Sequence, residues 1–277
     1  VITVASAMEL GKINANSKIN DTGKIKVGWW DIENYDYKKR PKPGMISLEY
    51  LFEHSSNVGS VRVAQTMTSK EFYDILKKFG IGTITGIDLP GESRGIMKPA
   101  NKWDTSDHAS MGYGYGASVT AIQMVAAVSA LANNGVRITP HIIKYSPDEA
   151  TNKIHSVQVL KPETAKAVTK ILTNSINQGK SQIKMEKFNV AAKTGTSKKP
   201  KEDGSGYTSK YYTSIVGYLP SSDPQVLIYV MVDSAQGGNV WGSTVAAPIF
   251  KEISSQVARI MNLKPDKNIS ETIKGVD

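Results

Sequence analysis

Two stretches of this 277-residue sequence decide how it is interpreted: His54-Ser55-Ser56-Asn57-Val58-Gly59 and Ala192-Lys193-Thr194-Gly195-Thr196. The first stretch lies between two expected helices, residues 47–53 and 58–66. In a tight turn the side chains of Ser55 and Asn57 can converge on one cleft, where a hydroxyl can relay a proton and an amide can bind a substrate amide. The same three residues also suit the N-cap of the following helix, and both interpretations can hold.

The second stretch follows an alternating run, residues 188–193, which predicts a strand. On a strand, Lys193 and Gly195 point to one face and Thr194 and Thr196 to the other. Gly195 lets a ligand lie close to the backbone, Lys193 adds positive charge, and the two hydroxyls can bind a carboxylate. A strand-edge N–H can also serve as an oxyanion donor. Taken alone, the pattern equally fits a strand end with a surface lysine.

A third pattern, Ser181-Gln182-Ile183-Lys184, fits the spacing of a serine nucleophile and its lysine. Such a nucleophile needs the first turn of a buried helix, where helix N–H groups and an enclosed lysine activate the hydroxyl. The neighbours of Ser181 are polar, so we expect it on a solvated connection and do not assign it as the nucleophile.

The bulk composition narrows the function classes. The net charge of +9 suits an acidic partner, yet the sequence has no recognition helix, zinc-finger spacing or aromatic–basic interleaving that would predict nucleic-acid binding. The absence of cysteine excludes disulfides and thiolate chemistry. The four histidines lie far apart without metal-ligand spacing, so we expect no metal site. The densest basic runs are residues 38–40 and 198–201.

The remaining elements outline an α/β chain. An apolar run over residues 1–10 has no capping residue before it, so we expect that the chain begins inside a helix and that an upstream segment is absent. We expect a buried helix at 117–134, another at 162–178, and three antiparallel strands at 188–193, 212–219 and 226–232. Thr244 can cap a last helix that reaches about Met261.

With these residues in place, the chain resembles the transpeptidase domain of class B penicillin-binding proteins, and most closely the septal, cell-division branch. The two motifs are joined by three further stretches in the family's order: residues 85–92, 111–116 and 245–250. The resemblance covers roughly residues 1–262 and implies the penicillin-recognising α/β fold, an antiparallel sheet flanked by helices. We therefore expect one domain over residues 1–262, the C-terminal part of a catalytic domain, and a polar tail over residues 263–277.

The resemblance implies a D,D-transpeptidase that cross-links D-Ala-D-Ala stem peptides through a serine acyl-enzyme. In that family the Ser-x-x-Lys nucleophile segment would come immediately before Val1. Carried over by position, Ser55 relays a proton, Asn57 holds the substrate amide and Lys193 gives electrostatic support. Thr194 and Thr196 would bind the terminal carboxylate, and the Thr196 N–H beside Gly195 would be half of the oxyanion hole. No cofactor and no metal is implied.

The implied partners are peptidoglycan stem peptides, β-lactams and divisome membrane proteins, with no nucleic acid. The implied location is the outer face of the bacterial cytoplasmic membrane, with an N-terminal anchor outside this chain. Two alternatives stay open: a β-lactamase or D,D-carboxypeptidase of the same fold, and a catalytically dead binding module. We also expect Lys193 and Thr196 to serve the same ligand as Ser55 and Asn57.

Overall fold

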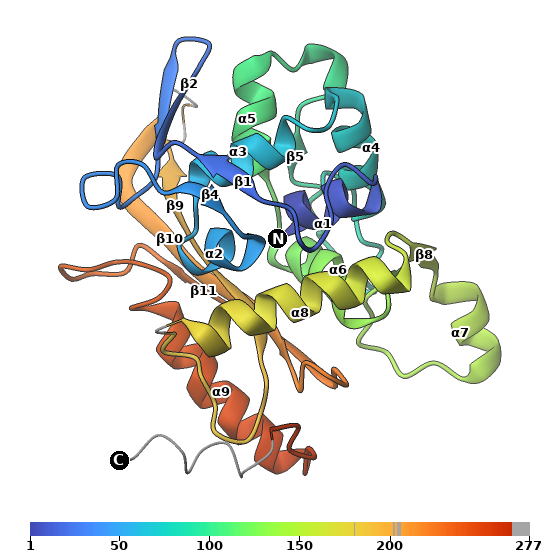
Figure 1. Ribbon diagram of the computed structural model, residues 1–277. Coiled ribbons are helices and arrows are strands. Elements are labelled where there is room, and N and C mark those ends of the chain that lie inside the picture. The colour runs from blue at the N-terminus through green and yellow to red at the C-terminus, as the bar shows by residue number, and fades with distance from the viewer. Residues whose placement is uncertain (180, 202, 204–205, 268–277) are drawn as a thin grey trace, which may run out of the picture. The chain divides into compact units, whose positions relative to one another are not determined.

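The computed structural model of the protein divides into two compact units, Val1–Ile171 and Leu172–Asp277. It describes residues 1–179, 181–201, 203 and 206–267 (Figure 1). Most of the expected tail, residues 268–277, lies outside the described residues. Among the described residues, no helix is long and apolar enough to cross a membrane.

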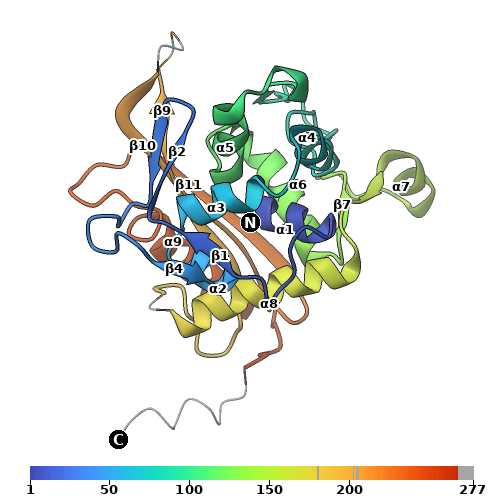
Figure 2. The same ribbon diagram turned by 45° about the horizontal axis from the view of Figure 1, so that its top comes forward.

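The first unit is mainly helical, with short two-stranded ladders between its helices (Figures 1 and 2). Its helices are α1 (Ile2–Glu9), α2 (Leu48–Glu53), α3 (Asn57–Ala64), α4 (Ser69–Lys78), the 3-10 turn η1 (Ala100–Lys102), α5 (Thr105–Tyr113), α6 (Ala121–Ala132), α7 (Pro147–Lys153) and the first part of α8 (Pro162–Gln178). Its strands are β1 (Ile19–Asp21), β2 (Lys24–Val27), β3 (Trp30–Glu33), β4 (Gly44–Ile46), β5 (Ile96–Met97), β6 (Ala117–Ser118), β7 (Val136–Ile138) and β8 (Ser156–Gln158).

Local sequence signals explain where these helices begin and end. Reciprocal capping boxes, in which the N-cap side chain and the third helical residue each bind the other's backbone, begin α4, α5, α6 and α7. At the end of α1, Gly11 adopts φ +69°, as expected for a glycine that stops a helix. α1 itself follows Val1, which provides no side-chain cap, and five of its residues, Thr3 to Ala7, are buried.

Helix α3 lies at the centre of the first unit. It contacts α1, α5, β1 and β3, and Val58, Val61 and Val63 are fully buried. The β2–β3 hairpin packs on it through a small apolar cluster that contains Val27, Ile32, Val61 and Ala109. Because several elements pack against α3, the turn that leads into this helix is anchored at a fixed position.

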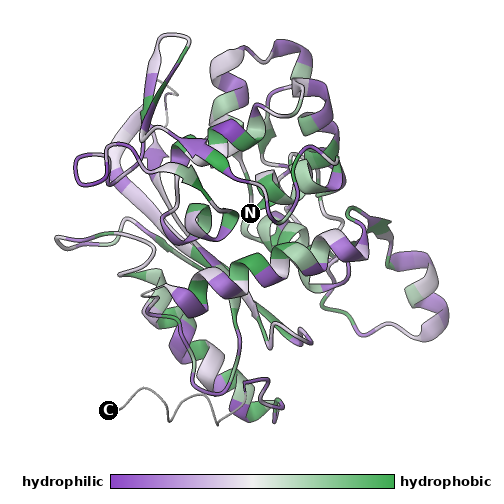
Figure 3. Ribbon diagram, in the orientation of Figure 1, coloured by the Kyte–Doolittle hydropathy of each residue, from purple (hydrophilic) through white to green (hydrophobic). Residues whose placement is uncertain are grey.

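The second unit is a three-stranded antiparallel sheet with α9 (Ala246–Ile260) packed against it. The strands are β9 (Ala191–Pro200), β10 (Tyr207–Leu219) and β11 (Val226–Asp233), in the order β11-β10-β9, so β9 is an edge strand of this sheet. Apolar residues of α9 such as Phe250, which is fully buried, meet Ile215 and Leu219 of β10 in one core. Figure 3 shows the resulting mixture of hydrophobic and hydrophilic residues along α9.

Several expectations are confirmed and three need correction. The three antiparallel strands of the second unit and the extent of α8 are confirmed. The buried helix expected at 117–134 begins only at Ala121, because Ala117 and Ser118 pair with β5 and Thr120 forms the cap. The strand expected at 188–193 begins at Ala191 and continues to Pro200.

The third correction concerns the last helix. Thr244 does not cap it, since α9 begins after Val245 with no side-chain cap. The Thr244 hydroxyl instead donates to the carbonyl of Asn239 and accepts from the N–H of Trp241, at 2.5 and 3.1 Å. It thereby closes the loop that leads into α9.

Candidate active site

Ser55 occupies the turn that ends α2, in a left-handed conformation with φ 48°. The N–H of Ser55 donates to the Phe52 carbonyl at 3.3 Å and that of Ser56 to the Leu51 carbonyl at 3.0 Å. This pair of bonds is the Schellman motif, in which the left-handed position is usually glycine. A serine there carries backbone strain, which recurs at functional sites.

Ser56 and Asn57 begin α3 directly after this turn. The hydroxyl of Ser56 accepts from the N–H of Gly59 at 2.7 Å, so Ser56 is the N-cap, as one of the two sequence interpretations expected. The side-chain nitrogen of Asn57 donates to the carbonyl of Glu33 at 2.9 Å, which fixes the orientation of the amide. Ser55 and Asn57 therefore lie in one turn, directly before and directly after the buried Ser56.

A buried polar network lies beneath this turn, and the sequence analysis did not identify it. The hydroxyl of Ser56 donates to Asp21 Oδ2 at 2.6 Å. The amide nitrogen of Asn34 binds both oxygens of Asp21, and its amide oxygen accepts from the N–H of Val58 at 3.1 Å. The one signal in the sequence is the turn composition of Asn20 to Gly23, since Asp21 Oδ1 accepts from the Gly23 N–H at 2.7 Å.

A basic residue from the first of the basic runs approaches the other side of the turn. Nη1 of Arg40 lies 3.1 Å from Nε2 of His54, the residue before Ser55. Because a guanidinium only donates, His54 Nε2 accepts and the ring proton is on Nδ1. Burial, together with the Arg40 charge, lowers the pKa of His54. The His54 ring also packs on Tyr50, with 4.0 Å between centroids.

The second group of candidate residues lies in the second unit, at the start of β9. Lys193, Gly195 and Thr196 pair with Val216, Ser214 and Thr213 of β10. The ammonium of Lys193 donates to the Thr194 carbonyl at 3.0 Å and lies 3.3 Å from the Thr194 hydroxyl. A Cβ on Gly195 would lie 2.7 Å from the Ser214 hydroxyl, so a larger residue here would require the Ser214 side chain to move. The structure thus brings Lys193, Thr194, Gly195 and Thr196 together on an edge strand.

Burial alters the acidity of Lys193. Desolvation lowers the pKa of its ammonium to about 8, because burial disfavours the charged form. A lysine in this state holds a proton at neutral pH and exchanges it more readily than an exposed one. It can therefore supply positive charge to a bound anion or take part in proton transfer.

A loop of the second unit contacts the hydroxyl of Thr196. The N–H of Gly242 donates to Thr196 Oγ1 at 2.9 Å. Trp241 beside it stands 6.5 Å from the ring of Tyr211, centroid to centroid. This loop cannot be recognised in the sequence, because only the glycine and the small residues after it distinguish it from a surface turn.

The alternative serine lies where it was expected. Ser181 is in a turn between α8 and β9, and its carbonyl accepts from the N–H of Lys184 at 3.4 Å. Lys184 is exposed. Ser181 therefore lacks the buried helix that activates a nucleophile of this class.

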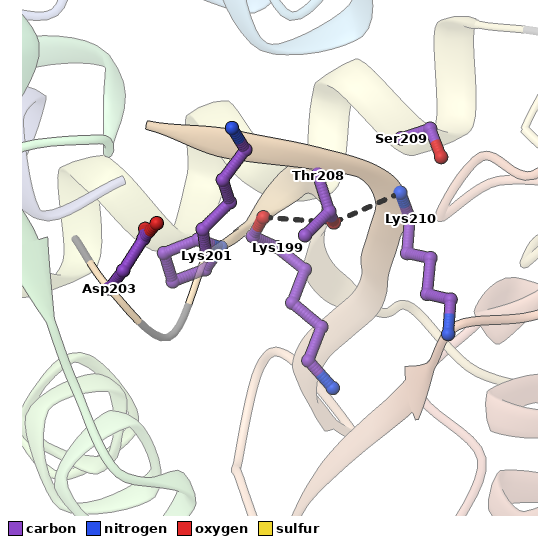
Figure 4. Close-up of a pocket in the computed structure, with 7 residues that line it drawn as sticks. Lys199, Lys201, Asp203, Thr208, Ser209 and Lys210 are labelled. Carbon is purple, nitrogen blue, oxygen red and sulfur yellow. Dashed lines mark hydrogen bonds between the residues drawn. The ribbon is translucent and has the colours of Figure 1, made fainter. Parts of the chain in front are cut away.

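An open cavity of about 510 Å³ lies at the far end of the β9–β10 hairpin (Figure 4). Thr208 bridges the two strands there, accepting from the Lys210 N–H and donating to the Lys199 carbonyl, both at 3.1 Å. The described residues that line the cavity include no motif residue. They are Lys199, Pro200, Lys201, Asp203, Thr208, Ser209 and Lys210. We therefore assign the candidate site to the motif residues and not to this cavity.

Comparison with solved structures defines the fold. The transpeptidase domain of penicillin-binding protein 3 from Burkholderia pseudomallei matches with a TM-score of 0.84 and 28% identity, over 96% of this chain and 78% of that one. Penicillin-binding protein 3 from Mycobacterium tuberculosis in complex with aztreonam matches with a TM-score of 0.81 and 25% identity, over 97% of this chain and 62% of that one. The fold is the mixed α/β fold of these domains, with antiparallel strands flanked by helices, as the resemblance implied.

Residues 1–255 match the family model of the penicillin binding protein transpeptidase domain. The chain therefore belongs to the penicillin-binding protein transpeptidase family, in its class B branch. Stage V sporulation protein D of Bacillus subtilis is 34% identical over 97% of this chain and 42% of its own length. Peptidoglycan D,D-transpeptidase FtsI of Escherichia coli K12 is 27% identical over 96% of this chain and 43% of its own length. The chain thus spans less than half the length of these relatives.

Proposed function

We propose that this chain is the C-terminal part of the catalytic domain of a serine D,D-transpeptidase that cross-links peptidoglycan. The observation that carries this proposal is the local geometry of the two motifs. Ser55 and Asn57 flank a buried cap in a strained turn, and Lys193 to Thr196 occupy an edge strand with a partly desolvated ammonium. Both are suited to binding and proton transfer.

The reaction proceeds in two acyl transfers. The hydroxyl oxygen of a serine attacks the carbonyl between the two D-alanines and gives up its proton, and the C–N bond breaks as the leaving D-alanine amine takes a proton. An amine of a second stem peptide then attacks the acyl-enzyme ester. The new C–N bond is the cross-link, the ester C–O bond breaks, and the proton lost by the amine returns to the serine oxygen. In this scheme Ser55 relays the proton, and the positive charge of Lys193 gives electrostatic support to this proton transfer.

Substrate binding in this scheme uses the other motif residues. Asn57 binds the stem-peptide amide, and Thr194 and Thr196 bind the terminal carboxylate. The N–H of Thr196 is one oxyanion donor, and Gly195 allows the substrate backbone to approach the strand. A β-lactam, whose carboxylate and strained amide have the same arrangement, acylates the same serine.

We propose that the nucleophile belongs to a Ser-x-x-Lys segment encoded directly before Val1. The family's motif order supports this position, and the only Ser-x-x-Lys of residues 1–277 is the turn at Ser181. The same proposal places the protein at the outer face of the cytoplasmic membrane, anchored by an N-terminal segment. Its role in division, with divisome membrane proteins as partners, follows from the resemblance to the septal branch.

Labelling with a fluorescent penicillin tests the proposed function. The protein as its cell makes it should form a stable covalent adduct, and peptide mapping should find the label on a serine outside residues 1–277. Lys193→Ala should reduce the labelling rate by about 10²–10³-fold, the usual cost of removing one preorganised electrostatic donor. Ser181→Ala is the matched control and should label at the original rate.

Three results would contradict the proposal. Loss of labelling in Ser181→Ala would make the alternative serine the nucleophile. Rapid release of the label would indicate a β-lactamase, because a transpeptidase keeps the acyl group for an amine acceptor. No adduct in the wild-type protein would indicate a binding module without catalysis.

A further inference from the structure

We propose that Asp21 is the positioning residue of the Ser55–Asn57 turn: its buried carboxylate, with Asn34, holds Ser56 so that the side chains on either side of it are correctly placed. This inference rests on the proposed function of that turn. Asp21 and Asn34 belong to no motif of the family named above. They come to the turn from the end of β1 and from the residue after β3.

The first observation is that Asp21 is buried as an acceptor. It is 0% exposed, and Asn34 and Ser56 are 5% and 2% exposed. In each hydrogen bond of its carboxylate, from Gly23, Asn34 and Ser56, Asp21 is the acceptor. No lysine or arginine of the described residues forms an ion pair with it, although burial of a carboxylate is costly unless it is paired or hydrogen-bonded. An apolar side chain would fill this position without that desolvation cost. The buried Asp21 carboxylate therefore serves a specific arrangement of hydrogen bonds and not stability alone.

The second observation is how this carboxylate is linked to the turn. The hydroxyl of Ser56 gives its one proton to Asp21 at 2.6 Å, so its lone pairs can accept from the N–H of Gly59 at 2.7 Å. Asn34 donates to Asp21 and accepts from the N–H of Val58 at 3.1 Å. Two N–H groups of the first turn of α3 are therefore held by side chains that Asp21 orients. The positive end of α3 in turn favours the Asp21 charge.

The third observation is that the two functional side chains adjoin this network. Ser55 immediately precedes Ser56 and is held at φ 48°, a conformation that persists only where its surroundings impose it. Asn57 immediately follows Ser56 and is bound to Glu33, the neighbour of Asn34. Movement of Ser56 would therefore shift both side chains at once. Asp21 does not touch the substrate in this proposal and acts only through Ser56 and Asn34.

An exchange of the two side chains provides the test. Asp21→Asn places a donor against the hydroxyl of Ser56 and the amide of Asn34, and Asn34→Asp places two carboxylates at the 2.9 Å contact. The double variant D21N/N34D restores one carboxylate and one amide in reversed order. The carboxylate, now at position 34, can then accept from Ser56 and Val58, and the amide at position 21 can donate to it and accept from Gly23. Each single variant should lose about 10- to 100-fold in acylation rate, the scale of a small misplacement, and the double variant should recover most of it.

Two readouts separate positioning from general stability. The acylation rate at saturating penicillin should fall in the single variants even at temperatures where circular dichroism shows them folded. Ile75→Val, a buried change in α4 away from the turn, should lower the melting temperature without changing that rate. Asp74→Asn, which removes an exposed carboxylate of the same helix and its surface ion pair with Lys70, should leave the rate unchanged and lower the melting temperature only slightly.

Amide hydrogen exchange at Val58 and Gly59 tests the same inference without acylation. Exchange should accelerate in both single variants and return toward the wild-type rate in the double variant. Unchanged exchange and unchanged acylation in D21N, or a double variant no better than the singles, would overturn the positioning role. If the wild-type protein forms no adduct, the proposed function fails, and the exchange data alone then decide the role of Asp21.

Discussion

The backbone N–H of Gly242 donates a 2.9 Å hydrogen bond to the hydroxyl of Thr196, which links the loop before α9 to the proposed carboxylate-binding strand. A Cβ at residue 242 would lie 2.5 Å from the Gly195 carbonyl oxygen and 2.7 Å from that of Ser214. The loop can reach Thr196 only because residue 242 is glycine. The Thr196 hydroxyl is therefore oriented by a contact 46 residues away in the sequence.

Gly242→Ala should weaken carboxylate recognition. The added methyl group pushes the loop away from β9, so the Thr196 hydroxyl loses its hydrogen-bond donor. The acylation rate should then fall about tenfold, the equivalent of one hydrogen bond. The free energy of unfolding should fall by about 1–3 kcal/mol because of the overpacking. Gly238→Ala is the control, since a Cβ there meets nothing within 4 Å. Equal rates for the two variants would rule out this role of the loop.

Replacement of Ser55 should separate backbone strain from proton relay. Ser55→Gly and Ser55→Ala both remove the hydroxyl, so both should lose acylation. The glycine variant should be more stable than the alanine variant by about 1 kcal/mol, because only glycine accepts φ 48° without a Cβ penalty. Chemical denaturation of the two variants measures the difference. Equal stabilities would show that the left-handed turn is not retained in solution.

The charge of Lys193 should make penicillin binding depend on pH. With a pKa of about 8, the ammonium is present below that pH and is lost above it, so the affinity for the anionic drug should fall as pH rises through about 8. Lys193→Arg keeps its charge throughout this range and should flatten the profile. Binding measured between pH 6 and about 9.5 checks this, and a parallel decline in both proteins would contradict it.

The same pKa predicts the stability effect of Lys193. Because burial lowers the folded-state pKa below the ordinary lysine value of 10.5, the unfolded chain binds the proton more tightly between about 8 and 10.5. The contribution of Lys193 to the free energy of unfolding should therefore rise with pH across that window. Comparison of Lys193→Met with wild type by thermal denaturation isolates this contribution, since methionine does not titrate. A pH-independent difference between them would argue against burial as the cause.

If the two motifs serve one ligand, their variants should be coupled. Ser55→Ala and Lys193→Ala should each reduce acylation strongly, and the double variant should lose much less than the product of the two effects, as for residues that act as a unit. Lys251→Ala, an exposed lysine of α9, is the control and should combine additively with Ser55→Ala. Additive losses for Ser55 and Lys193 would indicate two independent sites.

The sequence was enough to predict the family, helices α2, α3 and α8, and the positions of both motifs. These features depend on residues close together along the chain: the apolar period of α8, the Ser-Ser-Asn cap of α3, and the alternation and turn residues that bound the sheet strands. The four strands β1 to β4 were not predicted, because elements of three or four residues are too short to show a period.

The contacts that hold each motif in place come from residues far away in the sequence. Asp21, Asn34 and Ser56 form one network although 35 residues separate Asp21 from Ser56. The partner of Thr196 is likewise a backbone N–H of a distant loop, which no side-chain pattern could identify. The structure also shows that Thr244 closes its own loop and does not cap α9. The physical reason is the same in each case: hydrogen bonds between distant residues depend on packing, which local propensity does not encode.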